Sequence, residues 1–392
     1  MACDLYGSGN SVVNVVMQRG IRLLLLFIPP LIVVIMVGVS PLSAWFDRVV
    51  YDLLSQQYRS ASQVDTDVVI VDIDQESIEK LSGWPFNREV HASVIEVLTE
   101  SEVSSITYNV AFAAPDRGPK SGDSKLLNAI QASERVVLPL IAEEGKELGP
   151  LARMKLEGAV LGHADMPLDS DGRLRRSYLY AGMEFPRWPS LALATLHTYA
   201  PVKADLFSGL RTPYLHVGFS KHWSRDYEVL VPFGLNEFVE SIERISLLEL
   251  LSGEVASDQL RNKAVFVGLK DERIERKLQV AGNGRFSATE LHAFNFSALS
   301  RDYTLSPSLP VWAIVLGVLL TLCWGCFFLK LALSLRIMAL VACVVIACIP
   351  CFFLAIGYWI SVLPMLVGVV MMSVAVYMRR LLFQRTLKSV NA

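Results

Sequence analysis

Four apolar stretches, unevenly spaced, constrain the fold of this 392-residue chain more than any other feature. The first covers residues 22–41, and three more lie close together near the C-terminus, at 309–329, 337–356 and 358–378. An α-helix needs about 20 residues to cross the roughly 30 Å hydrocarbon layer of a membrane, and each stretch reaches that length. We therefore predict four transmembrane helices, one N-terminal and three C-terminal, and a folded domain formed by residues 42–308.

The charges beside these stretches predict the orientation of the chain. Four spans place the N-terminus (1–21), the turn between the second and third spans, and the tail (379–392) on one side of the membrane. All three segments are basic, with charges at Arg19, Arg22, Lys330, Arg336, Arg379, Arg380, Arg385 and Lys388. Basic residues in short flanks favour the cytoplasm. We therefore expect a multi-pass protein of the cell inner membrane with cytoplasmic termini and a periplasmic domain.

The first apolar stretch is either a cleaved signal peptide or a permanent anchor. Its apolar run is long for a signal peptide, and the proline makes Val39-Ser40-Pro41 a poor cleavage site, so an uncleaved anchor is favoured. Pro29-Pro30 removes two backbone donors inside this span, which predicts a kink. Such a kink is either a signalling hinge or a proline pair tolerated in packing.

Composition agrees with a membrane protein and argues against a nucleic-acid partner. The chain is 53% hydrophobic and 19% charged, its net charge is −2, and no basic stripe runs along residues 42–308. Of its six cysteines, Cys3 lies at the start and the others lie in predicted spans, so the external domain has no disulfide. The two Cys-x-x-Cys pairs have redox spacing, but cysteines in apolar helices act mainly as small hydrophobic residues.

Within residues 42–308, short apolar runs alternate with helical patterns, which predicts an α/β domain. Strands are expected at 67–73, 104–110, 135–140 and 264–268, and helices at 88–101, 124–133, 246–251 and 289–299. This alternation favours a mixed, largely parallel sheet with flanking crossover helices.

The middle of the domain has a different pattern. Segments 158–164 and 174–181 flank Asp169-Ser170-Asp171-Gly172-Arg173, where Asp-Gly is a strong turn signal, and this predicts a β-hairpin. A helix at 189–199, an irregular segment at 201–226 and a strand at 228–233 are expected to follow.

Four motifs stand in order along the external segment: Phe46-Asp47-Arg48 with Tyr51-Asp52-Leu53; Val68–Asp74 with Trp84-Pro85-Phe86-Asn87-Arg88 and His91; Gly162-His163 with Asp169-Ser170-Asp171-Gly172 and Arg175-Arg176; and Lys263–Gly268 with Glu290-Leu291-His292. As a set, and with the one-plus-three spans, they resemble the type-2 CHASE family (CHASE2, cyclase/histidine-kinase-associated sensory extracellular). The resemblance implies a sensor domain, which in this family is usually fused to a cytoplasmic cyclase or kinase. Two departures affect the identity of the ligand: Asn109 replaces the usual Asp, and Gly268-Leu269-Lys270-Asp271 replaces a Gly-Ala-Thr-like sequence.

Two carboxylates end the first predicted strand. Asp72 and Asp74 alternate along it, so both point to one face at the carboxyl end, where α/β sheets tend to bind ligands. A metal or a cationic ligand would suit them. The structural alternative is that Asp74 caps the next turn while Asp72 pairs with a basic residue such as Arg88.

Trp84, Arg88 and His91 are the next candidates for ligand binding. Arg88 and His91 share a helix face, and His91 could titrate near neutral pH. The alternative is that Trp84 packs on the sheet edge while Arg88 bridges to Asp72 or Asp74.

The remaining candidates have weaker signals. Asn109 belongs to the pocket that the resemblance implies, and Glu290 and His292 stand at a helix start, where capping or packing competes with binding. Asp169–Gly172 lacks the ligands of an EF-hand and favours a plain turn. The basic residues Arg173, Arg175 and Arg176 form either a solvated strand edge or an anion site.

No phosphate loop, nucleophile elbow, metalloprotease or kinase motif is present in the sequence, and the spans carry no charges in their interiors. We therefore predict a non-enzymatic sensor without a cofactor or metal, which relays a small-molecule or protein signal through its membrane helices. The tail after the fourth span is too short for a catalytic fold, so the output is expected on a partner protein or was removed. The alternatives are a structural or assembly subunit of an envelope complex, and an enzyme that uses Asp72 and Asp74 with a metal.

Overall fold

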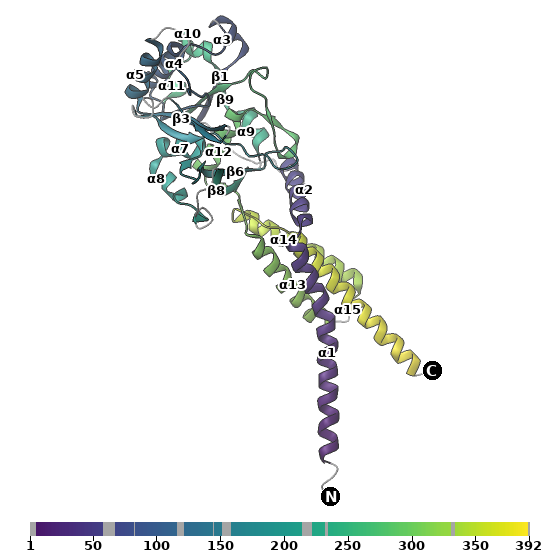
Figure 1. The fold of residues 1–392 in the computed structure, drawn as a ribbon. Helices are drawn as coiled ribbons and strands as arrows, with labels where there is room; N and C mark the ends of the chain where they lie inside the picture. Colours follow the sequence, from purple (N-terminus) through teal and green to yellow (C-terminus); the bar gives the residue numbers. More distant parts are fainter. Residues whose placement is uncertain are drawn as a thin grey trace. The chain divides into compact units, whose positions relative to one another are not determined.

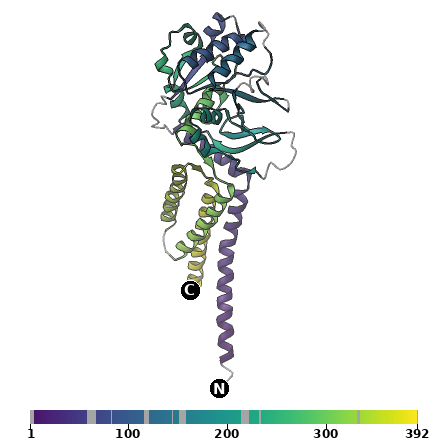
Figure 2. The same ribbon diagram turned by 90° about the vertical axis from the view of Figure 1, so that its left-hand side faces the viewer.

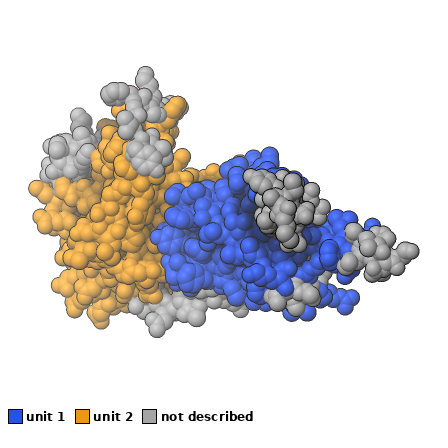
Figure 3. Space-filling view, turned by 90° about the horizontal axis from the view of Figure 1, so that it is seen from below, with its two compact units in different colours: residues 1–51, 306–392 blue, residues 52–305 orange. Residues whose placement is uncertain are grey.

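The computed structural model of the protein describes residues 5–57, 67–81, 83–115, 121–143, 145–150, 158–213, 222–231, 234–330 and 334–390 (Figure 1). It divides into two compact units, shown in different colours in Figure 3. One unit joins residues 1–51 to 306–392, and the other comprises residues 52–305.

The second unit is a mixed α/β domain built on a largely parallel sheet, which confirms the predicted fold class of the domain. The sheet has the order β4-β3-β2-β10-β1-β9, with β5 also paired to β3. Every pairing is parallel except that of β3 with β4. Its strands are β1 (Val68–Ile73), β2 (Ser105–Tyr108), β3 (Val136–Glu143), β4 (Lys146–Leu148), β5 (Val160–His163), β9 (Glu243–Ser246) and β10 (Ala264–Leu269).

Helices cover both faces of this sheet, because its central strands are apolar on both sides. Every residue of β1 is buried. Val69 and Val71 pack into one core with α3 (Gln75–Lys80), α4 (Arg88–Glu100), α5 (Ser121–Ser133), α10 (Leu247–Ser252) and α11 (Ser257–Leu260). Val68 and Ile70 pack into the other core with α7 (Leu191–Tyr199), α8 (Pro201–Ala204), α9 (Leu235–Ser241) and α12 (Ala288–Ser300).

The expected hairpin between 158–164 and 174–181 is wrong. Strand β5 lies parallel to β3 in the main sheet, whereas β6 (Arg176–Met183) pairs antiparallel with β7 (Trp188–Pro189) and β8 (Trp223–Leu230) in a separate sheet. The turn itself is present, since the Gly172 N–H donates to the Asp169 carbonyl at 2.8 Å and Gly172 has φ +77°. The short run of β5 is apolar enough to be buried between strand and helix, so it joins the main sheet instead.

Smaller elements complete the domain. They are η1 (Asp205–Phe207), β11 (Leu278–Gln279), η3 (Ala281–Asn283) and β12 (Arg285–Phe286). The predicted irregular segment 201–226 therefore contains a helical turn and the start of β8, while 214–221 lies outside the described residues. The predicted strand 228–233 corresponds to the end of β8, and residues 232–233 also lie outside them.

The first unit consists mainly of apolar helices: α1 (Leu5–Gly38), the start of α2 (Pro41–Gln57), α13 (Pro310–Lys330), α14 (Leu335–Ala355) and α15 (Leu363–Val390). Among the residues that the structure describes, three helical segments are long and apolar enough to cross a membrane: Pro310–Lys330, Arg336–Ala355 and Leu363–Arg385. A fourth span is obtained only if Leu24–Gly38 and Pro41–Ser55 are counted together, and these are bent by 68°. α1 is continuous through Pro29-Pro30, where we expected a kink, and the sharp bend lies after Gly38.

The last helix begins later than the apolar pattern suggests. α15 starts at Leu363, because Tyr358–Trp359 forms the short strand β14, which pairs in parallel with β13 (Ser306–Pro307). α1, α13 and α15 pack closely, and α13 and α15 lie side by side in Figure 2. A Cβ added at Gly368 would lie 2.0 Å from Thr321 Oγ1 and 2.7 Å from Val34 Cγ2. Small residues thus let these helices approach each other, as is usual in membranes.

Candidate functional site

The carboxyl ends of β1, β2 and β10 bring the predicted site residues of the sheet to one edge. In the parallel register, Asp72 of β1 lies opposite Gly268 of β10 and Ser246 of β9. Asn109 follows β2, and its N–H donates to the Val267 carbonyl at 2.8 Å. Parallel strands end at the same side of a sheet, and this edge is where α/β domains usually bind ligands.

Asp72 belongs to a buried ion-pair cluster with Arg244 and Glu290. The Asp72 carboxylate accepts from Arg244 Nη2 at 2.6 Å and from Arg244 Nε at 2.9 Å, a bidentate pair. The third guanidinium nitrogen, Nη1, donates to Glu290 at 2.6 Å, and Lys270 Nζ lies 3.0 Å from Asp72. Asp72 therefore pairs with basic residues, as the structural alternative expected, but not with Arg88.

Asp74 lies just beyond the strand and caps α3. Its Oδ1 accepts from the Ser77 N–H at 2.8 Å, which satisfies one free donor of the helix start. Asp72 and Asp74 thus have separate partners, which is the arrangement of the structural alternative. Among the described residues, no three His, Cys, Asp or Glu side chains lie close enough together to hold a metal ion.

Asn109 connects the strand edge to the loop after β10. Its amide donates to Thr289 Oγ1 at 3.1 Å and to Glu275 Oε1 at 3.4 Å. The other oxygen of Glu275 is buried and accepts no hydrogen bond. Burial, with a smaller effect from the nearby charge of Glu290, raises the pKa of Glu275 to about 7. This edge therefore carries a carboxyl group with an unsatisfied acceptor.

The backbone also comes close to α12 at this edge. A Cβ added at Gly268 would lie 1.9 Å from Thr289 Oγ1, so only glycine permits this approach. Thr289 is 2% exposed and starts the same helix that carries Glu290. Glu290 also completes a capping box, because its Oε2 accepts from the Ser287 N–H at 2.7 Å. Capping was one of the two roles expected for Glu290.

His91 lies in an aromatic cluster away from these carboxylates. It is 1% exposed, and its ring contacts Trp84, Phe86, Tyr108 and Phe112 at centroid distances of 5.0 to 6.2 Å. The guanidinium carbon of Arg88 lies 4.6 Å from the centroid of the Phe112 ring, and Arg88 Nη2 donates to the Ala114 carbonyl at 2.7 Å. The expected bridge from Arg88 to Asp72 or Asp74 is therefore wrong, since Arg88 points toward the segment after β2.

His292 points into the interior of the domain, apart from Glu290. The side chain is 2% exposed, and its Nε2 is buried without a hydrogen-bond partner. Burial, with a smaller effect from the nearby His163, lowers the pKa of His292 to about 3. His163 is itself fully buried, and its pKa is lowered to about 4 for the same reason. These two histidines are neutral core residues at physiological pH.

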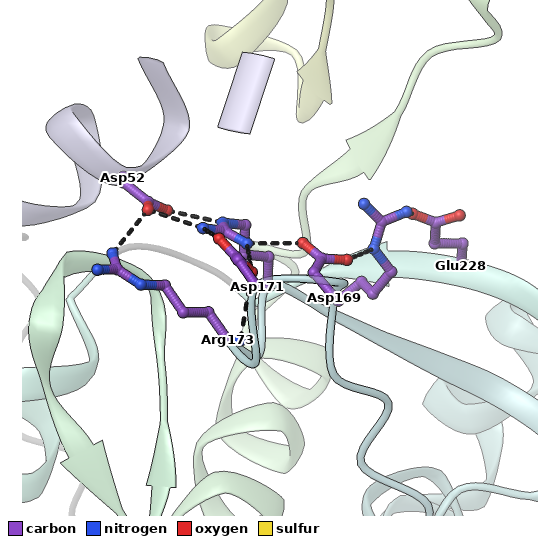
Figure 4. A network of polar contacts seen from close by, with 7 residues as sticks. Asp52, Asp169, Asp171, Arg173 and Glu228 are labelled. Atoms are coloured by element: carbon purple, nitrogen blue, oxygen red, sulfur yellow. Dashed lines mark hydrogen bonds and ion pairs between the residues drawn. The ribbon is translucent and has the colours of Figure 1, made fainter. Parts of the chain in front are cut away.

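A second polar cluster surrounds Arg175 (Figure 4). Arg175 is 3% exposed and binds Asp52 through Nε at 2.7 Å, Asp169 through Nη1 at 2.8 Å and Asp171 through Nη2 at 2.7 Å. The neighbouring Arg173 binds Asp52 at 2.9 Å. Two further pairs complete the Arg175 cluster: Arg176 with Asp169 at 3.0 Å, and Arg176 with Glu228 at 2.7 Å.

The solvated strand edge expected for these arginines is therefore wrong for Arg175, whose anions are carboxylates of the same chain. The hydrogen bonds of Arg175 lower the pKa of Asp171 to about 2, against the effect of burial. Asp52 comes from α2, more than a hundred residues before the turn. The sequence offered no signal for this pairing, because the burial of Arg175, which requires an acidic partner, is visible only in the structure.

Sequence reasoning also missed Arg244, Lys270, Thr289 and Glu275. A buried Asp72 needs a cation, but nothing in the sequence indicated that it would come from the edge strand β9. Glu275 lies in a charged run that is typical of an exposed loop. Its burial is visible only once the loop after β10 is placed against Asn109.

The two units define a class of protein that combines an α/β domain with apolar helices long enough to cross a membrane. The sequence profile of the CHASE2 domain matches residues 29–329. Because this match covers most of the chain, the protein belongs to the CHASE2 family, a family of extracellular sensor domains. Searches among curated proteins and among solved structures returned no significant match.

Proposed function

We propose that the protein is a signal-input protein of the cell inner membrane. Its periplasmic domain detects a small molecule or a protein, and the membrane helices relay the state of the domain to a separate or removed cytoplasmic output. Membership of a sensor family and three helices long enough to span a membrane support this proposal. In the proposal, the apolar part of α1, which ends at Gly38, supplies the fourth span. The basic flanks then place both termini in the cytoplasm.

The observation that carries the proposal is the ion pair between Asp52 and Arg175. Asp52 lies on α2, and α2 follows α1 after only two residues. Arg175 is buried beside the Asp169–Arg173 turn of the domain. Helix α2, which follows α1 after a sharp bend, is therefore held by a charged group of the domain. A conformational change in the domain could then move α2, and through the connected backbone α1.

The proposed sensing end is the sheet edge that carries Asn109, Lys270 and Glu275. Lys270 is half exposed and offers a cation, while the unsatisfied oxygen of Glu275 offers an acceptor. A small polar molecule that hydrogen-bonds to these groups would change the contact of the loop after β10 with α12. Arg88 and His91 contact Phe112 in the adjoining segment after β2, and Trp84 packs against His91.

Thermal unfolding of the full chain in nanodiscs tests the sensing role. Compounds grouped by charge are screened, and we expect one class to raise the unfolding temperature with saturation, because a ligand that binds only the folded state stabilises it. The gain should be lost in Lys270→Ala and Asn109→Ala. It should persist in the matched variant Lys277→Ala, since Lys277 pairs with Glu272 on the same loop. A rise in unfolding temperature that persists in all three variants would show that the compound does not bind at this edge of the sheet.

Copurification from mild detergent tests the output. We expect a cytoplasmic or membrane signalling protein to be recovered with the full chain, and its recovery should change when the stabilising compound is added. Recovery of the chain alone, with no partner protein at any stoichiometry, would contradict a separate output subunit. A stoichiometric membrane complex that does not respond to any ligand would instead favour a structural or assembly subunit.

A further inference from the structure

We propose that helix α2 lies on the outer surface of the lipid bilayer, with its apolar face at the boundary between headgroups and acyl chains. This face is formed by Leu42, Trp45, Val49 and Leu53. The inference rests on the membrane crossing of α1 that the proposed function includes. It adds a lipid-binding surface to the segment that joins the membrane helices to the domain.

The apolar face of α2 is exposed. Leu42, Trp45 and Leu53 are 54%, 54% and 51% exposed, and Val49 is 37% exposed. Their spacing of three, four and four residues places them within about 80° of arc on a helix that turns about 100° per residue. None of the four is charged. A folded protein leaves such a stripe exposed when another surface covers it.

The opposite face of α2 already has partners. Ser43 Oγ lies 2.8 Å from Ser361 Oγ, and the ring of Tyr51 packs edge-on against Trp359 at a centroid distance of 5.2 Å. Asp52, at one border of the stripe, is held by Arg175. The side of the helix opposite the stripe is thus in contact with other residues of the chain, and the stripe is the side that needs an occupant.

The direction of α2 fits a membrane surface. The axis of Pro41–Ser55 is bent by 68° from that of Leu24–Gly38. If α1 crosses the bilayer along its normal, α2 then runs within about 22° of the membrane plane, which is the orientation of an interfacial amphipathic helix. Exposed apolar side chains of α1, among them Ile32 and Met36, and the exposed Val39 of the turn precede this stripe along the chain. Trp45 adds an aromatic ring of the kind enriched at the interface.

Lipid accounts for the stripe better than a second copy of the chain does. A coiled-coil seam needs apolar positions repeated over several heptads, whereas this stripe has four positions and α2 ends at Gln57. The Trp45 ring and the two leucines are also typical of the side chains that anchor interfacial helices. The lipid surface is therefore the occupant that we propose.

Spin-label accessibility in nanodiscs tests this inference. In a chain whose six cysteines are replaced, Val49→Cys labels the stripe, and Ala44→Cys labels an exposed position outside it on the same helix. We expect the label at 49 to collide more with oxygen than with a water-soluble nickel complex, and the label at 44 to show the reverse. Ile32→Cys reports separately on the crossing of α1. Unfolding temperatures close to that of the native chain confirm that each variant is folded.

Each outcome decides between the alternatives. A water-exposed label at 49, with a lipid-exposed label at 32, would overturn the inference and leave the membrane crossing intact. Dipolar broadening of the spin-label spectrum at position 49 that disappears when labelled and unlabelled protein are mixed would show that a second copy covers the stripe. This result would also overturn the inference. A water-exposed label at 32 would overturn the crossing on which the inference rests.

Native tryptophan provides a measurement without cysteine replacement. Lipids brominated near the headgroup end of the acyl chains quench tryptophans at that depth. We expect Trp45→Phe to reduce the quenched fraction of the emission, while Trp188→Phe, in strand β7 of the domain, leaves it unchanged. Equal quenching in the native chain and in Trp45→Phe would contradict the inference.

Discussion

Glu275 shows how burial of one carboxyl group makes the domain sensitive to pH. Its pKa is about 7 in the folded chain, raised from 4.5 by burial. Between these values the folded state binds more protons than the unfolded state, so stability falls as pH rises from about 4.5 to about 7. His163 and His292 act in the opposite direction, because burial lowers their pKa values from 6.5 to about 4 and about 3. They lower stability as pH falls below about 6.5.

Glu275→Gln should therefore change the pH profile in a defined way. The variant removes the loss of stability between pH 4.5 and 7 while the histidine contribution remains, so the rise of stability with pH should become steeper in this range. Thermal unfolding at half-unit pH intervals measures the slope. Glu272→Gln, on the exposed part of the same loop, is the control. Parallel profiles for the native chain and Glu275→Gln would show that Glu275 titrates normally.

Gly268→Ala tests the close approach of β10 to α12. The added methyl group would meet Thr289 Oγ1, and overpacking of this kind costs about 1–3 kcal/mol of unfolding free energy. The double variant Gly268→Ala with Thr289→Ala should recover part of this loss, because the second change removes the obstructing hydroxyl group. Chemical denaturation of the single and double variants measures it, and additive losses would exclude a steric cause.

At the scale of elements, the Arg175 cluster joins α2 to the domain through charge. Replacing one partner of a buried ion pair leaves the others without a counter-charge, at a cost of about 3–5 kcal/mol. Arg175→Ala should therefore destabilise the domain far more than Arg173→Ala, whose side chain is 31% exposed. Denaturant unfolding compares the two variants.

A second measurement separates attachment of α2 from overall stability. Hydrogen exchange of the amides of α2 should increase in Asp52→Asn while the amides of β1 and β10 remain protected. Equal increases in α2 and in the central strands would mean that Asp52 supports the whole domain and does not act on α2 alone.

The elements also show how far the sequence predicts the structure. The buried runs of β1, β2, β3 and β10 and the helices between them were predictable, because continuous apolar runs and helical periods are local signals. The partner of β5 was not, because two neighbouring strands can pair with each other or join different sheets. The site was predictable only in part: Asp72 and Asn109 lie at the expected edge, but their partners Arg244 and Glu275 lie more than 160 residues further along the chain.

At the scale of the whole molecule, the proposed topology gives a direct test. An alkaline phosphatase reporter, which is active only outside the cytoplasm, should be active when fused within the domain, after Asp302. A green fluorescent reporter, which matures inside, should fluoresce when fused after Ala392. Phosphatase activity at the C-terminus would contradict cytoplasmic termini, and it would require an even number of spans after the domain.

The two connections of the domain differ in stiffness. On the N-terminal side the connection is α2, a helix that continues across the boundary at residues 51 and 52. On the C-terminal side, α12 ends at Ser300 and α13 begins at Pro310, with only the short strand β13 between them. A helix transmits rotation about its axis, whereas the extended segment between α12 and α13 transmits little of it. In the relay that we propose, torsion of the domain would reach α1 through α2, with a 68° change of direction after Gly38, whereas the strand connection would damp it before α13.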